Sequence, residues 1–116
     1  MRKSPILLGL VLSLAVACGG GGGGDADHEI VIEEFTYSPA QLKVKRGDTV
    51  RFVNRDAFEH TVTSGETSGP ENVPDGLFDE SLPDKGSAAV VTFDEAGTFT
   101  FYCQQHNAMD GEITVS

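Results

Sequence analysis

Basic residues are scarce in this 116-residue chain, which has 8 lysines and arginines against 18 aspartates and glutamates. A net charge of −10 argues against nucleic acid as a partner, because phosphate binding needs positive charge. The acidity fits either salt-rich surroundings or docking to a positively charged protein. The longest apolar run, residues 6–17, is too short to be a permanent transmembrane helix.

That run has the features of an export signal. Arg2 and Lys3 precede it, so residues 1–17 are predicted to be a secretory signal peptide. The segment ending in Cys18 resembles a bacterial lipoprotein signal, in which cleavage leaves a cysteine for acylation. We expect Cys18 to be lipidated and to hold an exported protein at a membrane, facing the periplasm or the cell exterior. The alternative is ordinary cleavage that leaves Cys18 a free thiol.

A flexible tether is predicted next. Residues 18–27 contain six consecutive glycines, which neither bury surface nor favour one conformation. Ten such residues span about 15–20 Å on average. The folded part is therefore predicted to be residues 28–116, a single domain and a monomer close to the membrane surface.

From residue 28 onward, apolar and polar residues alternate between turn residues, which is typical of β-strands. Val50 and Phe52 are predicted to share one face of a strand, and so are Ile113 and Val115. No stretch shows helical periodicity with caps at both ends. Seven to eight short strands predict an all-β sandwich. Residues 64–86 are expected to be irregular, with a short strand near Leu77 and one helical turn.

The cysteine count gives the first chemical indication. If lipid takes Cys18, then Cys103 is unpaired in an exported protein, and metal ligation explains it. Cys103, His106 and Met109 are spaced by three at a predicted strand end. Their side chains converge only if the chain leaves the sheet after Cys103 and curls. Thiolate, imidazole and thioether together are soft ligands that select copper.

A second imidazole has to come from elsewhere in the chain, where His28 and His60 remain. His28 lies beside the tether, whereas His60 begins a strand and is the better candidate. Two imidazoles, one thiolate and a weak thioether describe a blue-copper electron-transfer site with one copper ion. Taken singly, a cysteine or a methionine would only be apolar filler.

The segments 48–54, 60–62 and 97–109 resemble the cupredoxins, with amicyanin-, plastocyanin- and halocyanin-like proteins nearest. The pattern Gly-Thr-Phe-x-Phe-Tyr-Cys-x-x-His-x-x-Met carries this resemblance. It implies a Greek-key β-sandwich and a one-electron carrier rather than an enzyme. Many cupredoxins have asparagine where this chain has Thr61, so we expect a shifted reduction potential. The resemblance implies that further groups support the copper ligands, namely Asn54, Thr61, backbone groups near Gln104 and the carbonyl of Glu59.

The resemblance also implies surfaces for redox partners, which would be a cytochrome or an oxidase or dehydrogenase complex. Tyr102 is a candidate electron route, with strand packing as the alternative. Phe58, Asn107 and Ala108 are expected to surround the edge of His106. Six acids between Glu66 and Asp84 either steer a basic partner or form a solvated loop. The alternative function is a copper chaperone or store, although exposed methionine- and histidine-rich tracts are missing.

Overall fold

The computed structural model describes residues 26–68 and 71–116, and these residues form nine β-strands and no helix. In this part of the chain, accordingly, no helix could span a membrane. The predicted signal peptide and Cys18 lie outside the described residues, as does most of the predicted tether. The strands are β1 (His28–Glu33), β2 (Thr36–Ser38), β3 (Gln41–Val44), β4 (Asp48–Asn54), β5 (His60–Ser68), β6 (Glu71–Leu82), β7 (Ala88–Phe93), β8 (Gly97–Cys103) and β9 (His106–Val115).

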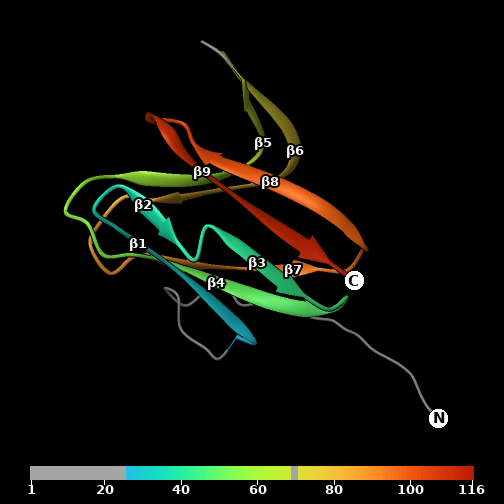
Figure 1. Ribbon diagram of the computed structural model, residues 1–116. Helices are drawn as coiled ribbons and strands as arrows, with labels where there is room; N and C mark the ends of the chain where they lie inside the picture. Colours follow the sequence, from blue (N-terminus) through green and yellow to red (C-terminus); the bar gives the residue numbers. More distant parts are fainter. Residues whose placement is uncertain (1–25, 69–70) are drawn as a thin grey trace.

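The strands form two sheets that pack face to face (Figure 1). One sheet has the order β2-β1-β4-β7, and the other has the order β3-β9-β8-β5-β6. β7 returns after the β5–β6 hairpin to pair antiparallel with β4, which is a Greek-key connection. The predicted all-β sandwich is therefore confirmed, with one strand more than expected in the described part of the chain. The short β2 had not been predicted as a separate strand.

The hydrophobic core lies between the two sheets and follows the alternation of the sequence. Val50 and Phe52 of β4 are fully buried in this core. Ile113 and Val115 of β9 are buried in the same core and belong to the opposite sheet. The predicted faces of both strands are confirmed. Tyr37 of β2 adds an aromatic ring that lies edge-on to Phe101 of β8, with 4.8 Å between centroids. This core fixes the relative positions of the strand ends that carry the site.

The prediction for residues 64–86 is wrong over most of its length. β5 and β6 run through this segment as a long antiparallel hairpin, and no helical turn occurs in its described residues. The register shifts after Thr63, so residues 75–78 bulge from the ladder. The Ser64 hydroxyl fills this irregularity by accepting a hydrogen bond from the backbone N–H of Phe78 at 2.9 Å. The sequence did not indicate the hairpin because it contains many polar side chains. Backbone pairing between strands does not require an apolar sequence.

Candidate metal centre

The β8–β9 connection brings two candidate ligands together. Cys103 ends β8, His106 begins β9, and the two residues pair across a two-residue turn. Tyr102 pairs with Asp110, so the three residues 107–109 bulge from the ladder between these pairs. The chain therefore curls as expected after Cys103. The strand that carries Ile113 and Val115 already begins at His106, inside the segment of the candidate ligands.

His60 enters the same place from the start of β5, a strand that pairs with β8. Its Nδ1 lies 3.7 Å from Cys103 Sγ, and Nδ1 of His106 lies 3.4 Å from the same sulfur. One ligand atom from each of the three residues lies within 4.8 Å of the others. His60 and Cys103 are fully buried, whereas His106 is half-buried. One imidazole of the cluster therefore reaches towards solvent.

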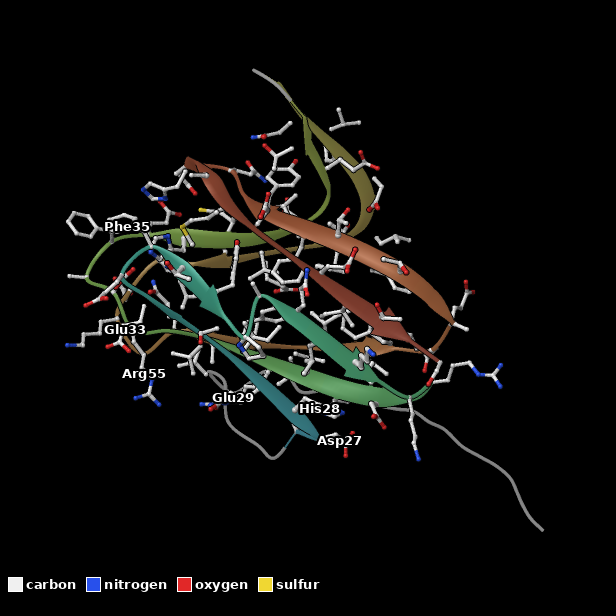
Figure 2. All side chains as sticks on the ribbon, viewed as in Figure 1. Asp27, His28, Glu29, Glu33, Phe35 and Arg55 are labelled. Carbon is white, nitrogen blue, oxygen red and sulfur yellow. The ribbon has the colours of Figure 1, made fainter. Side chains whose placement is uncertain are left out.

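His28 lies at the opposite end of β1 from the turn that contains Phe35 (Figure 2). Its Nε2 is 2.9 Å from Oδ2 of Asp48, far from the cluster in the fold. The structure thus brings His60, and not His28, to the sulfur of Cys103.

Met109 belongs to the three-residue bulge of β9. Its side chain is only 3% exposed and packs in the same buried cluster as Cys103. A bulge can re-aim a side chain that a regular ladder would point elsewhere. The position suits a thioether beside the thiolate, and the role of Met109 as the fourth ligand remains a prediction.

Thr61 connects the two segments that carry the candidate ligands. Its backbone N–H points to Cys103 Sγ at 3.4 Å, a hydrogen bond that stabilises a thiolate. Its hydroxyl accepts a hydrogen bond from the backbone N–H of Gln104 at 2.9 Å. Its carbonyl accepts a hydrogen bond of 2.6 Å from the Tyr37 hydroxyl, a contact that sequence reasoning missed. Burial, and then the nearby Cys103, raises the pKa of Tyr37, so this hydroxyl keeps its proton.

Asn54 supports the loop between β4 and β5 and does not contact the sulfur. Its side-chain amide donates hydrogen bonds of 2.9 Å to the carbonyls of Phe58 and Leu82. The Glu59 side chain lies at the surface, where its carboxylate accepts a hydrogen bond from Ser81. The Gln104 side chain turns away from the ligands and donates to Asp79 at 3.2 Å. These side-chain contacts do not involve the carbonyl of Glu59 or the backbone near Gln104, so the support expected from Asn54, Glu59 and Gln104 stays a prediction.

Asp56 is a residue that the sequence analysis missed. Its Oδ2 lies 2.8 Å from Nε2 of His60, and the carboxylate is only 11% exposed. Burial raises the pKa of this carboxyl, but hydrogen bonds from the Phe35 backbone, His60 and the Glu34 backbone together hold it below its usual value. An ionised Asp56 accepts the Nε2–H of His60 and leaves the lone pair of Nδ1 facing Cys103. The four-residue spacing from acid to histidine was the available signal.

Phe35 is the second residue that was missed. It lies in the β1–β2 turn, and its ring centroid is 4.9 Å from that of His106 and 5.3 Å from that of His60. Phe58 lies beside it, at 5.2 Å between centroids. Phe35 is 41% exposed and Phe58 is 59% exposed, and Ala108 is also exposed. Phe35 therefore presents apolar surface to the half-buried imidazole. The rim expected from Phe58 and Ala108 stays a prediction, and the side chain of Asn107 lies outside the described part.

Tyr102 is almost fully buried, at 1% exposure, although it was considered as a route to the surface. Burial, followed by Asp79 and Asp75, raises its pKa. Burial and Asp79 likewise raise the pKa of Glu80. An electron route through the Tyr102 ring would therefore end beneath the acidic β5–β6 hairpin, and its role remains a prediction.

The donor set fits copper. Two imidazole nitrogens and one sulfur lie within 4.8 Å of one another, and His60 is held with Nδ1 towards the sulfur. Soft sulfur with two imidazoles prefers copper over hard cations such as magnesium or calcium. The fold and the donors together define a copper-binding β-sandwich.

The chain belongs to the copper-binding proteins of the plastocyanin/azurin family, whose model matches residues 25–116. Plastocyanin of Daucus carota is 32% identical over 84 residues, covering 69% of this chain and 87% of that protein. Amicyanin of Paracoccus denitrificans is 34% identical over 99 residues, covering 78% of this chain and 67% of that protein. The solved structure of a purple cupredoxin from Nitrosopumilus maritimus has a TM-score of 0.67 at 28% identity. The match covers 78% of this chain and 100% of that chain.

The resemblance to cupredoxins is therefore confirmed, and so is copper as the cofactor. Members of this family are electron carriers and not enzymes, so the chain is a copper protein for electron transfer.

Proposed function

We propose that the chain carries one electron at a time on a single copper ion held by His60, Cys103, His106 and Met109. The convergence of two imidazole nitrogens on the Cys103 sulfur, within 4.8 Å, is the observation that carries the proposal. When bound, copper supplies a one-electron couple whose potential the weak fourth ligand adjusts.

The surrounding residues hold the donors in one arrangement. Asp56 orients His60, and Thr61 hydrogen-bonds both Cys103 and the backbone of Gln104. The sulfur is buried in the core, so its surroundings cannot rearrange freely. Rigid donors suit electron transfer, because little structure has to move when the charge of the site changes.

The partner is proposed to be a redox protein that docks over His106. This imidazole is the half-exposed member of the cluster, and Phe35 and Phe58 present apolar surface beside it. Electron donor and acceptor would be a cytochrome or an oxidase or dehydrogenase complex. The six acids from Glu66 to Asp84 are proposed to steer a basic partner, which requires association that slows as salt increases.

Absorption and electron spin resonance spectra of the copper-loaded protein test the proposal. The wild type should show an intense visible band from thiolate-to-copper charge transfer, which ascorbate bleaches reversibly. Cys103→Ser should lose the band and keep the fold, as circular dichroism would show. A wild type that binds copper without an intense band contradicts the proposal. A chaperone or store would instead transfer copper to an acceptor and exchange electrons slowly.

Export and membrane attachment complete the proposal. Residues 1–17 would be removed, Cys18 acylated, and the monomeric domain tethered outside the cytoplasm by residues 18–27. The sequence of residues 14–18 and the glycine run support this. The full chain is expressed in a bacterium and extracted with a detergent solution that separates into two phases on warming. The wild type should enter the detergent-rich phase, and Cys18→Ser should remain in the aqueous phase. Equal partitioning of both would exclude the lipid anchor.

A further inference from the structure

One carboxylate, that of Asp56, contacts both the candidate metal centre and the turn that carries Phe35. Besides Nε2 of His60, Asp56 accepts hydrogen bonds from the backbone N–H groups of Glu34 at 2.7 Å and Phe35 at 2.9 Å. Its own N–H donates to Asn54 Oδ1 at 2.8 Å, which fixes the start of the loop. Three donors from two separate segments therefore converge on two carboxylate oxygens.

The turn that Asp56 holds has an unfavourable backbone conformation. Glu34 and Phe35 have φ angles of 55° and 57°, which is the left-handed region that glycine and asparagine usually occupy. Each residue of this kind costs about 1–3 kcal/mol unless its surroundings fix it. The two hydrogen bonds to Asp56 supply that constraint. This turn places the Phe35 ring against His106, with 4.9 Å between the ring centroids.

We infer that Asp56 is the positioning residue of this site, holding His60 in its ligating tautomer and Phe35 over His106 at the same time. The inference rests on the proposed function, because it takes His60 as a copper ligand. A carboxylate that accepts the N–H of a ligating imidazole fixes the ring and raises its basicity. The same group then couples the buried ligand to the surface where a partner would dock.

Asp56→Asn is the main test, because asparagine offers one oxygen to three donors and turns an NH₂ group towards one of them. Losing the negative charge disfavours Cu(II), so the variant should favour Cu(I) at least tenfold more than the wild type. That ratio corresponds to a potential raised by about 59 mV for a one-electron couple. Glu33→Gln removes one charge from the exposed end of β1 and should change the ratio less than threefold.

Two readouts do not require copper. In the metal-free wild type, ¹⁵N spectra should show His60 protonated at Nε2, whereas Asp56→Asn and Asp56→Ala should show a mixture of tautomers. Amide exchange at Phe35 should be at least tenfold faster in both variants and unchanged in Glu33→Gln. If Asp56→Ala does not fold, the measurements on Asp56→Asn decide the test.

Different results would contradict the proposed function and the positioning role of Asp56. A wild type without the charge-transfer band ends the proposed function, whatever Asp56 does. The wild type can show the band while Asp56→Asn leaves the His60 tautomer, the reduction potential and amide exchange at Phe35 unchanged. That result overturns only the role of Asp56. A changed Phe35 exchange with an unchanged tautomer and potential would reduce Asp56 to a turn-stabilising residue and also overturn the inference.

Discussion

The hydroxyl of Thr61 and the backbone N–H of Gln104, 43 positions apart in the sequence, form a hydrogen bond of 2.9 Å that joins the two ligand-bearing segments. Thr61→Val keeps the shape of the side chain and leaves this N–H without its acceptor. We expect a loss of about 1–3 kcal/mol in the free energy of unfolding, because a half-buried donor loses its partner. Urea denaturation of the metal-free protein measures it.

Thr61→Ser is the matched control, since serine retains the hydroxyl and loses only a methyl group. It should stay within about 1 kcal/mol of the wild type. The copper-loaded Thr61→Val protein should also show an altered electron spin resonance spectrum, because Cys103 is no longer tied to β5 through Gln104. Equal stability and equal spectra of the two variants would show that the hydroxyl does not connect the segments.

Met109 provides a second prediction, which concerns the potential. Met109→Leu keeps the buried volume of the side chain and removes the thioether. Leucine cannot donate electron density to Cu(II), so Cu(I) should be favoured at least tenfold, raising the potential by about 59 mV or more. The intense visible band should persist, because the Cys103 thiolate remains. Cyclic voltammetry that gives the wild-type potential would exclude Met109 as a ligand.

The candidate ligands could be predicted from the sequence because cysteine, histidine and methionine are rare in this chain, so their clustering near residue 103 stands out. Asp56 and Phe35 belong to residue types that are common in this chain, so they do not stand out in this way. Asp56 is one acid among eighteen, and Phe35 is one phenylalanine among seven. Its position over His106 depends on two consecutive positive φ angles, which no local preference of glutamate or phenylalanine indicates.

The strands could likewise be predicted only in part. Alternation located β4 and β9, whose apolar faces are buried in the core, whereas the polar β5–β6 hairpin was largely missed. β5 buries polar residues, Thr61, Thr63 and Ser64, and residues 73–77 of β6 are exposed. Neither strand therefore shows the alternation of apolar and polar residues that indicates a strand.

Gly65 carries a third prediction, at the irregularity of the β5–β6 hairpin. Its φ is 135°, and an added Cβ would lie 2.1 Å from the carbonyl oxygen of Val73. Gly65→Ala should therefore cost at least about 3 kcal/mol, from backbone strain and forced displacement together. Gly76→Ala is the control in the same hairpin, because Gly76 also has a positive φ but open space around its Cα. It should cost about 1–2 kcal/mol, and equal losses would show that the hairpin adapts.

Asp48 gives a prediction for the dependence of stability on pH, away from the metal centre. A hydrogen bond from the Lys45 backbone, followed by one from His28, lowers the pKa of Asp48 in the folded protein. A carboxyl with a lower pKa in the folded state than its unfolded value of about 3.9 stabilises the fold above that value. This contribution is lost as the pH falls through the folded pKa. Asp48→Asn should therefore melt below the wild type at pH 6.

The difference between the two melting temperatures should shrink as the pH falls from 5 to 2, since the wild type then becomes protonated at Asp48 while asparagine does not titrate. The measurement uses metal-free protein at constant ionic strength, so that copper binding and screening do not contribute. Glu95→Gln, at an exposed acid outside this contact, should follow the wild-type curve. A difference for Asp48→Asn that stays constant down to pH 2 would show that the charge of Asp48 does not contribute, and that asparagine merely fits this turn less well.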